Sequence, residues 1–211
     1  MRLSICAVMA VAVLATPLVG VAQDTELSGN VGFASDYFYR GAPQGSSSAS
    51  AGLDLTAGSF NLGAWAADVA TGNEVDVYLG LSQDIGDLSV SVGGTAYLYT
   101  NDAFDTKYLE GNLNASIGVL SAEFSYGKHD TDALTTGDET YWFAAGTIAQ
   151  SGLHATFGTF GDGLDSQYIE AGYSLSVGDF DLSAAWIYSD DNADDHALTL
   201  GISHTFGIDT N

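Results

Sequence analysis

Apolar and small polar residues alternate with a period of two along most of the chain. In one segment, Ile169 and Leu175 fall on one face, and Glu170 and Ser174 fall on the other. Such alternation is typical of β-strands whose two faces meet different surroundings. About twelve such segments occur, most of them roughly 9 to 11 residues long, which is the length of a strand that crosses a membrane. No convincing helical period follows the first 22 residues.

The connections between the segments alternate in length. Short turns are predicted at 57–59, 86–87, near 118, at 151–152 and at 178–179, and mostly longer, Asp-rich loops at 38–48, 70–73, 100–107, 129–139, 161–167 and 189–195. Alternating short turns and long loops characterise outer-membrane barrels. The pattern predicts an all-β fold, a single antiparallel up-and-down transmembrane β-barrel of about 12 strands, with about 10 to 14 allowed. Both termini would then lie on the periplasmic side.

A secreted β-sandwich or a soluble lipocalin-like barrel would show the same alternation. Two features favour the membrane barrel. The polar face consists mostly of Gly, Ser, Asn, Thr and acids with almost no Lys or Arg, whereas a face in water usually mixes both charges. Aromatic residues also cluster near strand ends on the long-loop side, as in an interfacial girdle. These are Tyr37, Phe38, Tyr39, Tyr97, Tyr99, Tyr108, Tyr126, Tyr141, Trp142, Tyr168 and Tyr188.

The first residues have the features of a secretory signal peptide. Arg2 gives a basic start, an apolar run follows, and small residues stand before the expected cleavage after Ala22. The apolar run is too short and too interrupted by Pro17 for a membrane anchor. We therefore divide the chain into a signal peptide (1–22) and an outer-membrane barrel domain (23–211). The only cysteine, Cys6, belongs to the signal peptide, so no disulfide is expected in the mature protein.

Charge and hydrophobicity restrict the partners. The formal net charge is −23 and becomes −24 without Arg2, which makes nucleic acid a poor partner. Yet hydrophobic residues make up 46% of the chain, because the charges concentrate in the predicted loops and the apolar residues in the strands. The sequence predicts a protein of the Gram-negative outer membrane. Its expected partners are membrane lipid and lipopolysaccharide, the barrel-assembly machinery, and small solutes.

The stretch from Ser35 to Gln44 reads SDYFYRGAPQ and joins three aromatics, an acid and a rare arginine to a turn signal. With further matches at 63–65, 74–80 and 97–99, this stretch resembles the TorF family, a bacterial family long described as of unknown function. The resemblance covers most of the mature chain, with the specific motifs in its first half. It implies an outer-membrane β-barrel with an inferred channel role.

Polar side chains on the face opposite the apolar one are the candidate pore-lining residues. They are Asp36, Arg40, Asp54, Asp76, Glu110, Asn112, Asn114, Glu123 and Glu170. Rings of carboxylates favour cations, so we expect a porin-like passive, cation-selective channel for small polar or cationic solutes. Alternatively, these residues only form hydrogen bonds inside a filled barrel, which would make the protein a non-conducting structural or surface-interaction barrel.

Arg40 allows two interpretations. It could fold inward and pair with Asp36, which would narrow the mouth of a channel. It could instead be a structural arginine that binds loop carbonyls and a carboxylate, a use to which the fixed guanidinium fork is suited. The sequence alone favours the structural role.

Other chemistries find little support. The acidic pairs in the loops, Asp130 with Asp132, Asp162 with Asp165, and Asp190–Asp191 with Asp194–Asp195, lack the spacing of a defined calcium loop. No serine stands in a nucleophile motif, and the four histidines are dispersed. We therefore predict that the protein is not an enzyme and has no cofactor and no metal site.

Overall fold

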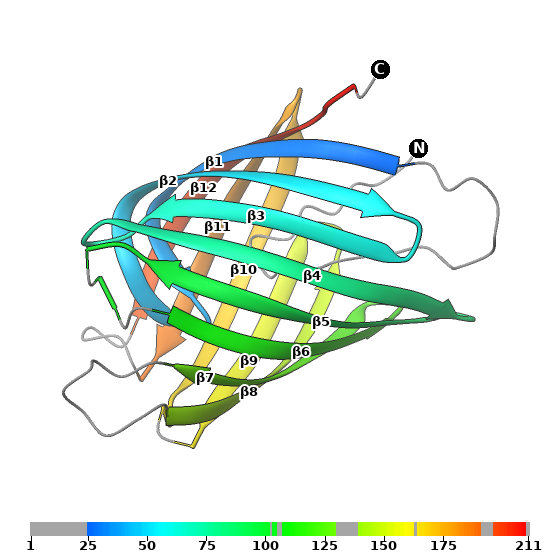
Figure 1. Cartoon of the computed structure of the whole chain (residues 1–211). Helices are drawn as coiled ribbons and strands as arrows, with labels where there is room; N and C mark the ends of the chain where they lie inside the picture. Colours follow the sequence, from blue (N-terminus) through cyan, green and yellow to red (C-terminus); the bar gives the residue numbers. More distant parts are fainter. Residues whose placement is uncertain are drawn as a thin grey trace.

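Twelve antiparallel strands close into one barrel (Figure 1). The structure is a computed structural model that describes residues 25–101, 103–104, 107–129, 139–162, 164–190 and 196–209. The strands are Thr25–Tyr39 (β1), Ala42–Ala57 (β2), Phe60–Asp68 (β3), Asn73–Ile85 (β4), Leu88–Tyr99 (β5), Lys107–Ile117 (β6), Leu120–His129 (β7), Glu139–Gln150 (β8), Leu153–Gly161 (β9), Gln167–Val177 (β10), Phe180–Ser189 (β11) and His196–Gly207 (β12). The predicted fold class and strand number are therefore confirmed.

Each strand pairs with its neighbours in sequence, and β1 closes the ring on β12. The closing register pairs Ser28 with Gly207 and Ala34 with Gly201. At one end of the barrel, two-residue turns join β2 to β3, β4 to β5, β6 to β7, β8 to β9 and β10 to β11. We call this end the turn end. The opposite end is the loop end. Within the described residues, no helix is long and apolar enough to cross a membrane.

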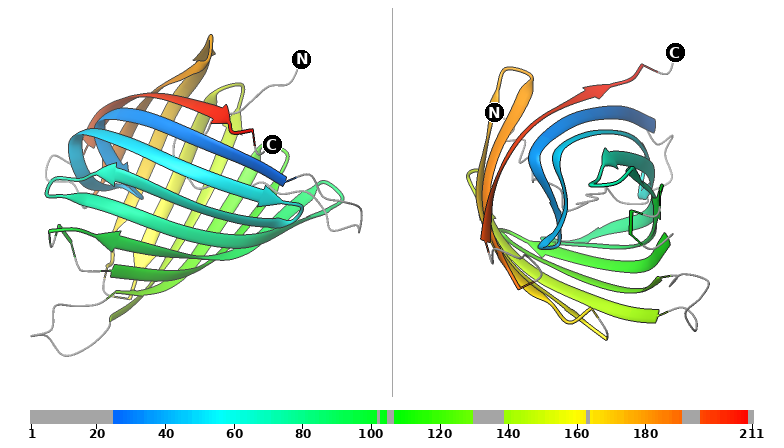
Figure 2. Two further views of the ribbon diagram at one scale, coloured as in Figure 1. Left: turned by 45° about the horizontal axis from the view of Figure 1, so that its top comes forward. Right: turned by 90° about the vertical axis from the view of Figure 1, so that its left-hand side faces the viewer.

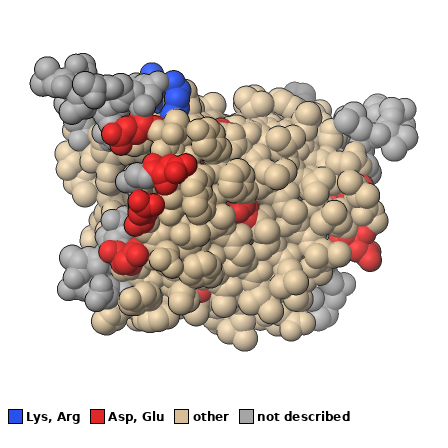
Figure 3. All heavy atoms as spheres, turned by 90° about the horizontal axis from the view of Figure 1, so that it is seen from below, with Lys and Arg blue, Asp and Glu red and all other residues tan. Residues whose placement is uncertain are grey.

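The outward face of the wall is apolar. Leu79 on β4 is 54% exposed, Leu113 on β6 is 52% exposed, and Leu200 on β12 is 55% exposed. Figure 3 shows that acidic groups gather toward the ends of the molecule and leave a broad middle without charge over most of the visible side. A water-soluble fold would bury such side chains, so this band requires an apolar environment around the barrel.

The β1–β2 hairpin departs from the regular wall at the loop end. Pairing of β1 with β12 ends at Ala34, and pairing of β2 with β3 ends at Ser50. Beyond these points the two strands continue to pair only with each other, and the hairpin curves in from the wall (Figure 2). The predicted loop at 38–48 is therefore wrong, because both strands extend until only residues 40 and 41 separate them.

Two local irregularities bend this hairpin. Ser47 has a φ of 56° in the left-handed region, and the β1–β2 register shifts between Tyr37 and Phe38. Register shifts of this kind increase twist and redirect a strand. As a result Tyr37, which shares sequence parity with the outward residue Phe33, is only 7% exposed and packs with Ala67 and Val69. The serine-rich stretch thus forms a bend in a strand.

The predicted aromatic girdle is wrong for several of its members. Tyr97, Tyr141 and Tyr168 are 6%, 2% and 8% exposed. Their side chains belong to the inner face, whereas Tyr126 and Tyr188 are 54% and 43% exposed on the outer face. Many loop-end aromatics therefore fill the barrel interior. The predicted signal peptide and residues 130–138 of the predicted loop at 129–139 lie outside the described residues.

Candidate functional site

Arg40 stands at the tip of the β1–β2 hairpin, inside the barrel. Arg40 and Gly41 form the two-residue connection, with φ of 49° and 84°. Two consecutive residues with positive φ suit a tight hairpin turn that matches strand twist. A Cβ on Gly41 would lie 2.5 Å from the Cβ of Tyr168 on β10, so glycine is needed for close approach as well as for conformation. The tip therefore lies against the interior side of the opposite wall.

The guanidinium of Arg40 binds two carboxylates from neighbouring strands. Its Nη1 and Nη2 donate to Oε1 and Oε2 of Glu110 at 2.6 and 3.0 Å. Nη2 also donates to Glu123 Oε1 at 2.5 Å and to Ser125 Oγ at 3.1 Å. The fork-on-fork pairing with Glu110 is the strongest geometry available to this ion pair. The side chains of Arg40 and Glu110 are 7% and 1% exposed, and that of Glu123 is 24% exposed.

Further hydrogen bonds fix the Glu110 carboxylate. Tyr141 donates to Oε1 at 2.8 Å, Tyr97 donates to Oε2 at 3.2 Å, and Asn112 donates to Oε2 at 2.9 Å. Asn112 also donates to Ser125 Oγ at 3.0 Å, which ties β6 to β7. A buried carboxylate needs this many donors to offset its loss of hydration. The wall of the site is thus held in place by its own residues, independently of Arg40.

Aromatic rings enclose the guanidinium. The Arg40 Cζ lies 4.1 Å from the centroid of Phe143 and 4.8 Å from that of Tyr39. A cation over an aromatic face gains electrostatic stabilisation, the more so away from water. Phe160 packs on Phe143 with centroids 4.7 Å apart and extends the aromatic surface along β9. The site therefore combines two carboxylates with an aromatic plate, and both groups recognise a guanidinium.

Other contacts fix the rest of the hairpin. Tyr37 donates to Glu74 on β4 at 2.7 Å, and the hydroxyl oxygens of Tyr39 and Tyr97 lie 2.5 Å apart. Nearer the wall, Thr199 on β12 donates to the backbone carbonyl of Asp36 at 2.6 Å. The hairpin is thus anchored along β4 and β12 and reaches across to β6 and β7.

The structure brings four of the sequence-predicted residues together: Arg40, Glu110, Asn112 and Glu123. The suggested pairing of Arg40 with Asp36 is wrong, because Arg40 binds Glu110 and Glu123 while Asp36 accepts a hydrogen bond from Ser46 at 3.0 Å. Asp36 lies on the wall side of the register shift between Tyr37 and Phe38, whereas Arg40 lies beyond this shift at the tip.

The remaining predicted residues have other surroundings within the barrel. Asp54 accepts hydrogen bonds from Asn30 and Tyr78, and Glu170 lies 2.9 Å from His154 Nε2. Asp76 is 6% exposed, and Asn114 is half-buried beside Glu123 on the next strand. Asp130, Asp132, Asp191, Asp194 and Asp195 lie outside the described residues.

Sequence reasoning missed several members of the site. Ser125 and Phe143 contact the Arg40 guanidinium, and Glu74 binds Tyr37 on the same hairpin, but none of the three is among the predicted residues. Glu74 is two residues before Asp76 on the same face, so alternation alone could have identified it. Phe143 could not have been found in this way, because apolar residues occupy both faces of Glu139–Gln150 and parity does not indicate which face points inward.

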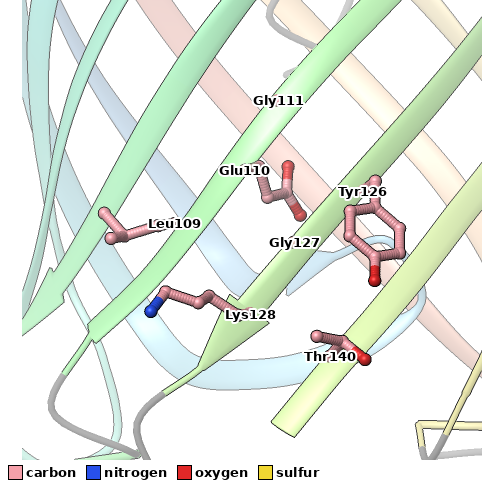
Figure 4. A pocket seen from close by; sticks show the side chains of 7 residues that line it. All are labelled: Leu109, Glu110, Gly111, Tyr126, Gly127, Lys128 and Thr140. Atoms are coloured by element: carbon pink, nitrogen blue, oxygen red, sulfur yellow. The ribbon is translucent and has the colours of Figure 1, made fainter. Parts of the chain in front are cut away.

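A depression of about 340 Å³ lies on the outer side of the same strands (Figure 4). Its lining residues are Leu109, Glu110, Gly111, Tyr126, Gly127, Lys128 and Thr140. The side chains of Leu109, Tyr126 and Lys128 are exposed on the outer face and alternate along β6 and β7 with the inward positions of Glu110 and Gly127. Successive side chains of a strand point to opposite faces. The depression and the Arg40 contacts therefore occupy opposite sides of one wall.

The fold and site define a twelve-stranded β-barrel with an apolar outer wall and a charged cluster inside. Residues 19–201 match the model of a family described as "Bacterial protein of unknown function (Gcw_chp)". The chain belongs to this family. A search of curated proteins finds no match.

Comparison with solved structures finds matches at low sequence identity. A protein from a study of the in-meso crystallisation of membrane proteins is 9% identical with a TM-score of 0.62, over 88% of this chain and 85% of that one. The outer membrane protein OpdK of Pseudomonas aeruginosa is 14% identical with a TM-score of 0.44, over 78% and 58%. Acinetobacter baumannii OccAB2 is 12% identical with a TM-score of 0.44, over 90% and 65%. The match covers less than two thirds of the length of OpdK and of OccAB2.

The unequal burial of the two carboxylates predicts unequal effects of their removal. We expect Glu110→Gln to lower the free energy of unfolding by about 3 kcal/mol or more, because it leaves a buried guanidinium without its bidentate partner. Glu123→Gln should lower it by about 1 kcal/mol, because that carboxylate is partly hydrated. Urea titration followed by tryptophan fluorescence measures both values. Equal losses would contradict the assigned importance of the Glu110 pair.

Proposed function

We propose that the protein is an outer-membrane, porin-like passive channel for small polar or cationic solutes. The observation that carries this proposal is the separation of an apolar outer wall from an interior lined by Asp54, Asp76, Glu110, Glu123 and Glu170. The apolar band meets the requirement of a membrane-spanning barrel that its outer face contact lipid. The resemblance to the TorF family, whose members have an inferred channel role, also supports the proposal.

The interior charge favours cations over anions. Within the Arg40 cluster, two carboxylates face one guanidinium, so the cluster keeps an excess negative charge. Asp54 and Glu170 add further carboxylates along β2 and β10. Charges act more strongly in a narrow pore than in bulk water, because less water screens them. A solute with a positive group would therefore enter more readily than an anion.

A non-conducting barrel is the second candidate, and the β1–β2 hairpin is the observation that favours it. Arg40 reaches from the hairpin tip to β6 and β7, and Gly41 lies against Tyr168 on β10. A segment that crosses the interior at the loop end reduces the cross-section available to solutes. The two candidates differ in whether current passes through the protein in a bilayer.

Export and assembly follow from the same proposal. Residues 1–22 would direct the chain across the inner membrane and be removed, leaving a barrel domain that starts at 23. The barrel-assembly machinery would insert this domain into the outer membrane, where lipid and lipopolysaccharide would contact the apolar band.

The membrane environment can be tested on a single strand. Leu79 and Ile85 both lie outward on β4 and are 54% and 62% exposed, but Leu79 is near the middle and Ile85 is at the turn end. Leu79→Arg should destabilise the barrel folded in lipid vesicles by about 2–4 kcal/mol, and Ile85→Arg should destabilise it by about 0–1 kcal/mol. Urea titration in vesicles gives both values. If the two arginines are tolerated equally, the apolar band does not lie in a bilayer.

Channel function and its charge preference are tested by planar-bilayer recording. In a KCl gradient we expect a cation-selective reversal potential, which weakens in concentrated salt because the Debye length falls from about 10 Å at 0.1 M to about 3 Å at 1 M. The double variant Asp54→Asn, Glu170→Gln should reduce the selectivity. Arg40→Gln should leave its sign unchanged, because it only increases the excess negative charge.

Asp179→Asn serves as the control for this measurement. It removes one carboxylate from the exposed β10–β11 turn, outside the interior cluster, and should leave the reversal potential close to that of the wild type. Anion selectivity would overturn the role given to the interior acids. Absence of any conductance from protein that has folded would favour the non-conducting barrel.

A further inference from the structure

We infer that the inner wall at Glu110, Glu123, Ser125 and Phe143 is a receptor for guanidinium groups, occupied in this structure by the protein's own Arg40. We call these four residues the wall site. A solute that carries a guanidinium would compete with Arg40 for it and release the hairpin tip. The inference builds on the proposed channel, because it names the class of solute that the interior recognises.

The wall site is built independently of its occupant. Glu110 is held by Tyr97, Tyr141 and Asn112, and Asn112 in turn binds Ser125. All these residues come from β5 to β8, which pair in regular register with one another. Departure of Arg40 would therefore leave a preorganised carboxylate pair and an aromatic ring. A preorganised site loses less free energy on ordering when it binds a ligand.

The geometry discriminates between cations. Glu110 accepts two parallel hydrogen bonds from two different nitrogens of Arg40, and Glu123 shares one of those nitrogens. Such a planar fork matches a guanidinium, whereas an ammonium is a compact point charge. The face of Phe143, 4.1 Å from the Arg40 Cζ, suits a flat cation that can stack. The preferred solute class is therefore alkylguanidinium compounds, with primary amines second.

The hairpin is constructed so that its tip can leave while its base stays attached. Three residues from the tip on either strand, Tyr37 packs with Ala67 and Val69, and the Ala70 amide donates to the Gln44 carbonyl at 2.8 Å. Between these contacts and the tip the strands pair only with each other, and their register shifts between Tyr37 and Phe38. The left-handed Ser47 lies on the wall side of Gln44. The tip is held mainly by Arg40 and by the Tyr39–Tyr97 contact. Competition for the wall site acts on the strongest of these links.

The first test measures binding to a vacated wall site. Arg40→Asn removes the guanidinium and keeps a residue that tolerates positive φ at this turn. Titration calorimetry should show that methylguanidinium binds the folded variant at least tenfold more tightly than it binds the wild type. The uncharged isostere methylurea should not bind detectably, and methylammonium should bind more weakly. Adding Glu110→Gln and Glu123→Gln to Arg40→Asn should abolish binding.

A matched control removes two carboxylates elsewhere. Asp87→Asn with Asp179→Asn, in the Arg40→Asn background, changes the charge equally at two equivalent turn positions. This control should retain the methylguanidinium affinity. The inference is overturned if Arg40→Asn binds methylguanidinium no better than methylurea, or if the turn variants reduce binding as much as the wall variants do.

The second test uses the unaltered protein, so it does not depend on whether any variant folds. Millimolar methylguanidinium should accelerate backbone hydrogen exchange in residues 38–42 severalfold, whereas methylurea at the same concentration should not. Strands β6 and β7 should keep their protection. Unchanged exchange at the tip would overturn the release of the hairpin by a competing solute.

Neither test requires conduction, so the two proposals can fail separately. Binding and tip release without any bilayer current would keep the wall site and reject the channel. A cation-selective current from a protein that shows no preference for methylguanidinium over methylurea would keep the channel and reject the wall site.

Discussion

A guanidinium buried inside a protein must be paired, and this constraint shapes the loop end of the barrel. Arg40 is 7% exposed, so the lost hydration of its charge has to be replaced by nearby acceptors. Glu110 and Glu123 supply these acceptors only if the hairpin tip reaches β6 and β7. The left-handed turn at Arg40 and Gly41, the bend at Ser47 and the inward course of β1 and β2 all serve that approach.

Alternation along the chain was sufficient to predict the strands, the short turns and the direction of most side chains. It succeeded because lipid-like and polar surroundings select opposite residues at every second position. Along β5, Leu98 is exposed and Tyr97 is buried, as their parity indicates. The aromatic girdle was predicted from nearness to strand ends alone. Parity already placed Tyr97 on the polar face, so that prediction overlooked evidence that the sequence contained.

The partners of Arg40 could not be predicted, because they depend on curvature. Glu110 and Glu123 are 70 and 83 residues away from Arg40 in sequence. Only the closed ring brings β6 and β7 within reach of the tip, and only the bend in the hairpin turns Arg40 away from Asp36. Alternation assigns Tyr37 to the outer face, whereas the bend places it against Ala67 inside. Local patterns lose their meaning where a strand leaves its sheet.

The charge balance of the interior changes when Arg40 is placed among the acids. With the arginine in an outer loop, the wall would contain only carboxylates, which repel one another and favour any cation equally. Arg40 instead neutralises part of one pair and leaves Asp54 and Glu170 as carboxylates on other strands. Recognition then differs along the interior. A general preference for cations arises from the dispersed carboxylates, whereas selection by shape arises only where two carboxylates meet an aromatic ring.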